Sequence, residues 1–264
     1  MKKVFLALSS LFLTSCSLLN ISGASSNNDV LSIKVANSKV NLTLSEKQSF
    51  DKSSSSLSIQ TIPQFEETTY TSLPSQDFLD NEETPYNAGA YINETGGTIM
   101  RYLKYTFYLK NTGNNTAKYN LKIKLNDKKE SSDGTQRSLD DTLRVMVYEN
   151  DVNSIESEAL SNCDIFAKPA AEYNIDKDGN RTKREFVAQY PYLNEEDDGH
   201  PLAISFESTN VVVTYQRNNF VKDQIRRYTL VVWLEGEDPQ SECLQEAPVG
   251  SSIKLGVDMI GSEN

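Results

Sequence analysis

Histidine, cysteine and tryptophan are scarce in this sequence of 264 residues, which contains one histidine, three cysteines and one tryptophan. His200 stands between a glycine and a proline, and the sequence has no His-Glu-x-x-His pair, which excludes a zinc peptidase site of that type. It also has no Gly-x-Ser-x-Gly nucleophile elbow and no glycine-rich phosphate loop. We therefore predict a protein that is not an enzyme.

Long hydrophobic runs are also missing. The apolar stretch Val4–Leu13 is too short for a transmembrane helix, which needs about 20 residues. It follows two lysines and precedes Thr14-Ser15-Cys16, which is the order of a secretory signal. A cysteine directly after a small residue resembles a bacterial lipoprotein signal. The resemblance implies that residues 1–15 are removed, that Cys16 is lipidated, and that the lipid holds the protein at the outer face of the cell membrane. An ordinary cleaved signal and a true membrane anchor are the alternatives.

Positively charged residues are fewer than negatively charged ones, so the formal net charge is −11. It becomes −13 when Lys2 and Lys3 are removed with the signal segment. A surface this acidic repels nucleic acid and anionic lipid head groups, so we predict no nucleic-acid partner. Of the cysteines, Cys163 and Cys243 remain after lipidation. They can form one disulfide in an oxidising compartment, or they can be two separate buried thiols, and both interpretations stay open.

Residues 16–29 are rich in serine and asparagine, which is typical of a flexible tether after the lipidated cysteine. Residues 30–264 are predicted to form one β-sandwich domain, within which residues 30–97 are either part of the sandwich or a loop-rich N-terminal extension. Short alternating pieces within Val30–Leu44 predict strands near the start of this domain.

Strict alternation of apolar and polar residues is clearest in two neighbouring segments. The apolar positions are Leu103, Tyr105, Phe107 and Leu109 in the first segment and Tyr119, Leu121, Ile123 and Leu125 in the second. The segment Asn111–Asn115 between them has the composition of a turn. The pattern predicts a β-hairpin with one face in water.

Other segments also predict strands, and no long helical pattern is present. The predicted strands are Leu143–Tyr148, Phe186–Tyr190, Val211–Tyr215 in a sheet interior, Tyr228–Leu234 with Trp233 in the core, and Ile253–Met259. Residues Ser154–Ser161 are predicted to form a short helix. Many strands with frequent turns favour an all-β fold, an antiparallel β-sandwich that is jelly-roll-like with Ig-like features.

Four patches resemble a known group of proteins. They are Tyr105–Leu125, Leu143–Asp151, Tyr228–Cys243 and Ile253–Met259. Together they resemble secreted β-sandwich proteins of Firmicutes related to the camelysin/TasA group. The resemblance implies a jelly-roll-like domain outside the cell that is sometimes a matrix or fibre component. The lipoprotein signal departs from that group and points to an anchor, an adaptor or another surface module.

One segment has the spacing of a calcium loop. Its candidate ligands are Asn174, Asp176, Asp178, Asn180, Thr182 and Glu185, with Gly179 at the sixth position. In such loops the glycine permits a sharp turn and the final glutamate closes the site. The asparagine at the first position, Arg181 at the eighth and the missing flanking helices depart from the pattern. The alternative is a hairpin turn between strands that end near Tyr173 and begin near Phe186. Apart from this calcium ion, we predict no cofactor.

Two further acidic groups are interpreted as solvated loops. They are Glu195–Asp198 and the set Glu235, Glu237 and Asp238.

These observations favour a non-enzymatic, lipid-anchored cell-surface protein used for adhesion, matrix attachment or assembly. Its expected partners are the membrane, through the lipid on Cys16, and a cell-surface protein, a matrix protein or a second copy of itself. The alternative is a surface-tethered binding module for a small ligand or a polysaccharide, with tyrosines between Tyr70 and Tyr91, Tyr190 and Tyr192 stacking on sugars.

Overall fold

The structure is a computed structural model that describes thirteen ranges of the chain. They are 29–37, 40–60, 68, 73, 86–87, 90–92, 98–129, 139–152, 161–168, 173–175, 181–183, 203–235 and 252–263. The predicted helix at 154–160 and the predicted strand Phe186–Tyr190 lie outside these ranges, and Ser161 begins a strand.

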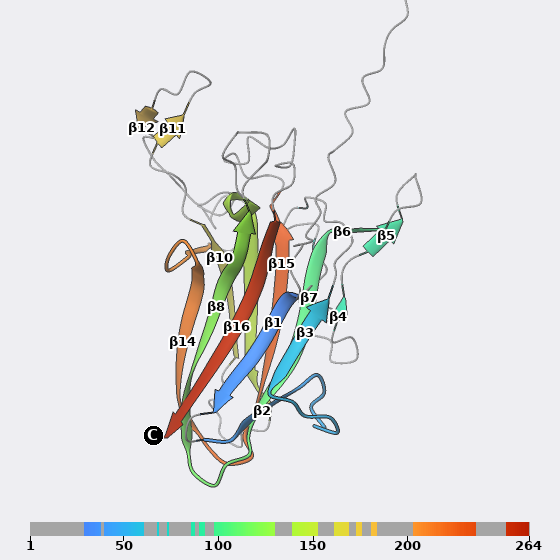
Figure 1. Ribbon diagram of the computed structural model, residues 1–264, viewed down its shortest axis with the longest axis vertical. Coiled ribbons are helices and arrows are strands. Elements are labelled where there is room, and N and C mark those ends of the chain that lie inside the picture. Colours follow the sequence, from blue (N-terminus) through green and yellow to red (C-terminus); the bar gives the residue numbers. More distant parts are fainter. Residues whose placement is uncertain are drawn as a thin grey trace, which may run out of the picture.

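Two mostly antiparallel sheets pack face to face, which confirms the predicted all-β sandwich (Figure 1). The five-stranded sheet has the order β14 (Val211–Phe220), β8 (Ala117–Lys129), β16 (Ser252–Glu263), β1 (Asp29–Asn37) and β3 (Ser56–Gln60). The seven-stranded sheet has the order β13 (Ile204–Ser205), β10 (Ser161–Ala167), β9 (Leu143–Asp151), β15 (Ile225–Leu234), β7 (Tyr102–Asn111) and β2 (Leu42–Ser45), and β4 (Tyr86–Asn87) also pairs with β7.

Smaller elements complete the described residues. Strands β5 (Ala90–Ile92) and β6 (Thr98–Met100) pair with each other, as do β11 (Tyr173–Ile175) and β12 (Arg181–Lys183). A short 3-10 helix, η2, covers Leu139–Asp141. In the five-stranded sheet, β1 runs parallel to β16, with Ile33 opposite Val257. Strands β1 and β2 place the predicted strand pieces of Val30–Leu44 in the two sheets, and β3 was not predicted.

The hydrophobic core lies between the two sheets because every second residue of each strand points inward. Its members on the central strands are Leu121, Ile123, Leu255, Val257, Phe107, Leu109, Leu230 and Val232. Strand β15 lies between β9 and β7 and is buried from Tyr228 to Leu234, as the sequence predicted. Trp233 is fully buried, which confirms its predicted packing role.

The predicted hairpin of residues 103–125 is wrong, although both of its strands exist. Strand β7 belongs to the seven-stranded sheet and β8 to the five-stranded sheet, so the turn between them carries the chain across the sandwich. The Asn111 side chain shapes this crossing, because its Nδ2 donates to the carbonyl oxygens of Asn115 and Phe220 at 2.9 and 2.8 Å. Its Oδ1 accepts the N–H of Gly113 at 2.9 Å. Alternation predicted the strands but did not determine their partners.

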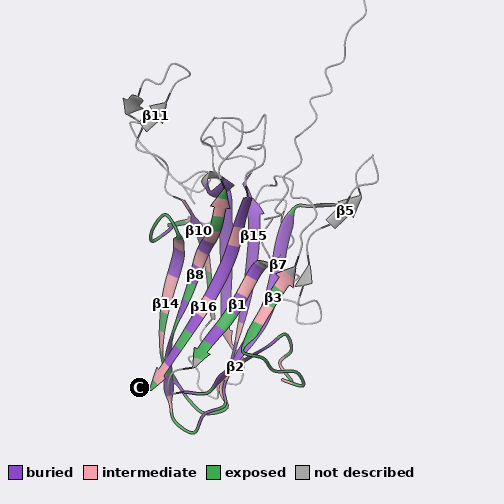
Figure 2. Ribbon diagram, viewed as in Figure 1, coloured by how far each residue is buried: buried purple, intermediate pink, exposed green. Residues whose placement is uncertain are grey.

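The two sheets differ in how far their outer faces are exposed. On β8 the predicted wet face is confirmed, with exposed Lys118, Asn120 and Lys122, and Figure 2 shows exposed residues among buried ones along this sheet. On β7 the predicted wet face is wrong, because Lys104 and Thr106 are buried. A second apolar cluster covers this outer side, formed by Tyr102, Met146, Tyr148, Ile165, Val231 and Trp233, with Leu73 and Ala203 packed against it.

Strand β14 is an edge strand, so its predicted place in a sheet interior is wrong. Its apolar character comes from Val212 and Val213, which are buried at the start of the strand. The Glu207 carboxylate accepts the backbone N–H of Thr214 at 2.6 Å and the hydroxyl of Thr214 at 2.8 Å. These bonds occupy a donor that an open edge would otherwise offer to another strand.

Candidate binding face

The outer side of the five-stranded sheet is the candidate binding surface, which we call the lysine face. It consists of the outward residues Lys118, Asn120, Lys122, Lys124 and Asn126 of β8, Lys254, Asp258, Ile260 and Ser262 of β16, Ser32 and Lys34 of β1, Ser56 and Ser58 of β3, and Thr214 and Gln216 of β14. All are exposed or half-buried, whereas the residues that alternate with them pack in the core.

Strand geometry places the cations at regular intervals. Alternate residues on one strand are about 7 Å apart and neighbouring strands about 4.8 Å apart. On β8 this spacing separates Lys122 from Lys124, and Lys118 lies two such steps from Lys122. Across the sheet, Asp258 stands between Lys122 on one side and Lys34 on the other. The face therefore carries a row of lysines along β8, and the cation of Lys34 lies two strands away.

Asp258 is the central acid of the lysine face, and it forms an ion pair with Lys124. At one end of the face, Lys254 Nζ lies 3.1 Å from Asp127 Oδ2. The side chain of Lys124 lies across Gly256, where an added Cβ would come within 3.1 Å of its Cε. Within the described residues, Lys34, Lys118 and Lys122 make no ion pair or side-chain hydrogen bond. Their exposed ammonium groups therefore remain available to a partner.

A shallow depression of about 490 Å³ lies on this face. Its lining includes Lys122, Lys124, Asn126, Asp258 and Thr214. It is partly open to solvent, whereas sites for small organic molecules are mostly enclosed. Its shape suits contact with an extended partner along the sheet.

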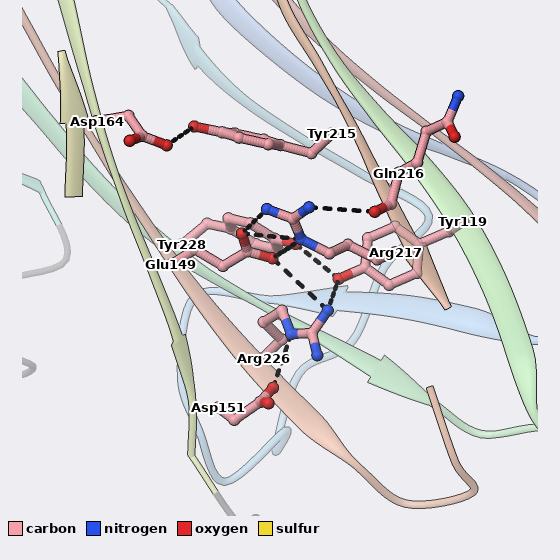
Figure 3. Close-up of polar contacts among 9 residues, drawn as sticks. All are labelled: Tyr119, Glu149, Asp151, Asp164, Tyr215, Gln216, Arg217, Arg226 and Tyr228. Carbon is pink, nitrogen blue, oxygen red and sulfur yellow. Dashed lines mark hydrogen bonds and ion pairs between the residues drawn. The ribbon is translucent and has the colours of Figure 1, made fainter. Parts of the chain in front are cut away.

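The second polar group of interest is a charge network between the sheets, which Figure 3 shows in close-up. Glu149 on β9 is fully buried and accepts a hydrogen bond from Arg217 Nε of β14 at 2.8 Å. It also accepts a bond from the Tyr228 hydroxyl of β15 at 2.6 Å. Arg226 Nε donates to Asp151 Oδ1 at 2.7 Å. The network joins strands of both sheets through two arginines and two acids.

A chain of donors runs through this network. Arg226 Nη1 donates to the Tyr119 hydroxyl at 2.8 Å, and the Tyr119 and Tyr228 oxygens lie 2.6 Å apart. Because Tyr228 donates its proton to Glu149, Tyr119 is the donor between the two phenols. Burial raises the pKa of Tyr119 to about 12 and raises the pKa of Tyr228 well above its usual range. Both phenols therefore stay protonated at neutral pH and cannot serve as bases.

At the outer end of the network, Arg217 stacks on the Tyr215 ring, with its guanidinium carbon 4.5 Å from the ring centroid. The Tyr215 hydroxyl donates to Asp164 of β10 at 2.7 Å. These contacts link β14 to the seven-stranded sheet. The central carboxylate of Glu149 is buried, and its bonds to Arg217 and Tyr228 connect the two sheets.

The predicted calcium ligands are only partly covered by the structure. The backbones of Asn174 and Thr182 lie directly opposite each other in the antiparallel strands β11 and β12, which come closer to the predicted turn than the strand ends near Tyr173 and Phe186 that the alternative gave. Asp176, Asp178, Asn180 and Glu185 lie outside the described residues. Among those that are described, no three His, Cys, Asp and Glu side chains gather to hold a metal ion. Calcium binding stays a prediction.

The cysteine predictions are also only partly covered. Cys16 and Cys243 lie outside the described ranges, so lipidation and the disulfide stay predictions. Cys163 lies on β10 and is exposed, which makes the alternative of two buried thiols wrong for this residue. In the part of the chain that is described, no helix is long and apolar enough to span a bilayer.

Glu235 corrects the interpretation of the third acidic group. It is fully buried, its Oε2 accepts the indole N–H of Trp233 at 2.9 Å, and its backbone N–H donates to Thr142. It is therefore part of the packed structure, not of a solvated loop. Glu237, Asp238 and Glu195–Asp198 lie outside the described residues. So do most of the tyrosines proposed to stack on sugars, and that alternative stays a prediction.

Sequence reasoning did not find the network of Glu149, Arg217 and Arg226. One signal was present, because each of these residues continues the apolar period of its strand. Glu149 follows Val145 and Val147 in phase, and Arg217 follows Val213 and Tyr215. A charged residue in phase with core positions indicates a buried partner of opposite charge.

No protein-family model, no curated protein and no solved structure matches this chain. The resemblance to the camelysin/TasA group therefore stays a prediction.

Proposed function

We propose that this chain is a non-enzymatic, lipid-anchored cell-surface protein whose sandwich serves adhesion, matrix attachment or assembly. The observation that supports the proposal most is the difference between the two sheets. The outer face of the seven-stranded sheet carries a buried apolar cluster, whereas the lysine face of the five-stranded sheet remains open to solvent. An open face on a rigid sandwich is suited to docking on a large partner.

The interior adds a second argument. Its charged groups form hydrogen bonds between the two sheets, and the phenols of Tyr119 and Tyr228 keep their protons. Such a network stabilises one arrangement of the sheets and provides neither a nucleophile nor a base. The lipoprotein signal supplies the expected address, since a lipid on Cys16 would hold the sandwich at the membrane surface.

Vesicles that carry the purified full-length protein test this function. We expect them to bind to intact cells or to isolated extracellular matrix, or to cluster with one another, whereas vesicles without protein do neither. Vesicles carrying the protein that showed neither binding nor clustering would overturn the proposal. For the anchor, wild-type protein should enter a detergent phase after expression, and Cys16→Ser should remain in the aqueous phase.

A further inference from the structure

We propose that the lysine face binds an acidic polysaccharide. Lys34, Lys118 and Lys122 would contact its carboxylates, and the amide and hydroxyl side chains between them would bind its sugar hydroxyls. This inference rests on the proposed function and deepens it by giving the attachment partner a chemical class.

The first argument is charge complementarity. The chain as a whole is strongly acidic, yet five lysines lie on the lysine face, and only two of them are paired with an acid, Lys124 with Asp258 and Lys254 with Asp127. Within the described ranges, the other three lysines form no ion pair, although Asp258 lies opposite Lys34 and Lys122 on the neighbouring strand. Exposed charges attract a polymer of opposite sign over about one Debye length, about 8 Å at physiological salt. A local excess of lysine therefore selects an anionic partner despite the net charge.

The second argument is composition, which separates a polysaccharide from a protein partner. Protein interfaces are enriched in aromatic residues, methionine and arginine and depleted in lysine and serine. The lysine face has the opposite composition, with lysine, asparagine, serine, threonine and glutamine around a single large exposed apolar residue, Ile260. Alternating cations, amides and hydroxyls suit a hydrated chain that carries both carboxylates and hydroxyls.

The third argument concerns charge density. Asp258 lies at the centre of the face, between Lys122 and Lys34. Its carboxylate would repel a polyphosphate, which is charged on every unit and has no hydroxyl to donate to the carboxylate. The same carboxylate can accept hydrogen bonds from sugar hydroxyls. A polysaccharide with carboxylates spaced along a hydroxyl-rich chain fits this arrangement better than a polyphosphate.

The test measures binding of full-length protein in detergent to four immobilised polymers: polygalacturonate, neutral dextran, polyphosphate and polyglutamate. We expect binding to polygalacturonate that weakens with added salt, and no binding to dextran. The variant Lys34→Gln/Lys118→Gln/Lys122→Gln should bind polygalacturonate about tenfold more weakly, since each exposed charge contact contributes modestly. A matched variant, Lys47→Gln/Lys52→Gln/Lys222→Gln, changes the net charge equally at exposed positions off this face and should bind within twofold of wild type.

The outcomes separate this inference from the proposed function. Equal binding by the two triple variants, or no binding of the wild type to polygalacturonate, would overturn the acidic-polysaccharide assignment. Preferential binding to polyglutamate or polyphosphate would overturn it too, in favour of an acidic protein or a phosphate polymer. If vesicles carrying the protein still attached to cells or matrix in these cases, the proposed function would stand without this partner. Equal thermal unfolding midpoints of the two variants would establish that both are folded.

Discussion

The hydroxyl oxygens of Tyr119 and Tyr228 lie 2.6 Å apart, although the two residues belong to opposite sheets. Aromatic packing supports this contact, because the Tyr119 ring lies edge-on to Phe220 at 5.2 Å and the Tyr228 ring stacks on Phe107 at 5.4 Å. Core packing and polar bonding therefore fix the same pair of side chains. The sheets are held in one relative position, which gives the lysine face a rigid support.

Stability should fall at alkaline pH because of Tyr119. Burial raises its pKa from 10.0 to about 12, so the unfolded chain ionises first. The resulting stabilisation is fully present below pH 10 and is lost as the pH rises from 10 to 12. For this one group the free energy of unfolding should fall by about 1.4 kcal/mol per pH unit in that window. Urea unfolding across the window measures the slope. Tyr119→Phe should show a shallower slope, and an equal slope in the variant would contradict the assignment.

Replacing the buried carboxylate of the network should be costly. Glu149→Gln leaves Arg217 without an acid, whereas Arg226 keeps Asp151, and breaking a buried ion pair typically costs about 3–5 kcal/mol. Urea unfolding should therefore show a midpoint well below that of the wild type. Glu263→Gln, at an exposed position of β16, is the matched control and should change the free energy of unfolding by less than about 0.5 kcal/mol. Similar midpoints for both variants would remove the structural role assigned to Glu149.

Gly261 on β16 should tolerate no side chain. An added Cβ would come within 2.4 Å of Val40 Cγ2 and 2.9 Å of Leu42 Cδ1, both in buried residues. Overpacking of this kind costs about 1–3 kcal/mol, which thermal unfolding of Gly261→Ala would reveal. Gly256→Ala is the comparison, because its nearest contact is the end of the Asn126 side chain on the solvent face, which can move. If Gly256→Ala proved the more damaging of the two, the inferred packing of β16 on β2 would be wrong.

Glu207 should prevent the exposed edge of β14 from pairing with strands of other chains. Glu207→Ala removes both acceptors of Thr214 and leaves its backbone donor open. We expect a loss of about 1 kcal/mol in stability together with concentration-dependent association in light scattering. Glu263→Ala, which removes an exposed carboxylate elsewhere, should remain at the wild-type association state. If Glu207→Ala remained monomeric at high concentration, Glu207 would not be needed to prevent association through the β14 edge.

Local patterns predicted most strands but not their neighbours. The apolar period of residues 119–125 identified β8 and its wet face, since alternation depends only on one strand having one buried side. The same period at residues 103–109 identified β7 and predicted that its other face would be exposed to solvent. That face is buried, because distant residues such as Leu73 pack on that side of the sheet. What covers a face depends on tertiary contacts that no window of the sequence contains.

The candidate sites show the same limit. The lysines of β8 were predictable as solvent-facing residues, but their neighbours Lys34 and Asp258 come from strands far away in sequence. Likewise, Glu149 and Arg217 are brought together by the packing of two sheets. Sequence phase marks each residue as inward or outward, and only the topology shows which residues meet.

The parallel pairing of β1 with β16 also has a kinetic consequence. These strands stand near opposite ends of the described sequence, and β16 separates β1 from β8 within the five-stranded sheet. The sheet therefore stays divided until β16 has been synthesised and inserted. Such long-range pairing gives a high contact order, and domains of this kind fold in about milliseconds to seconds. During synthesis, β1 and β8 emerge before the strand that joins them, which makes them targets for chaperones that bind unpaired strands.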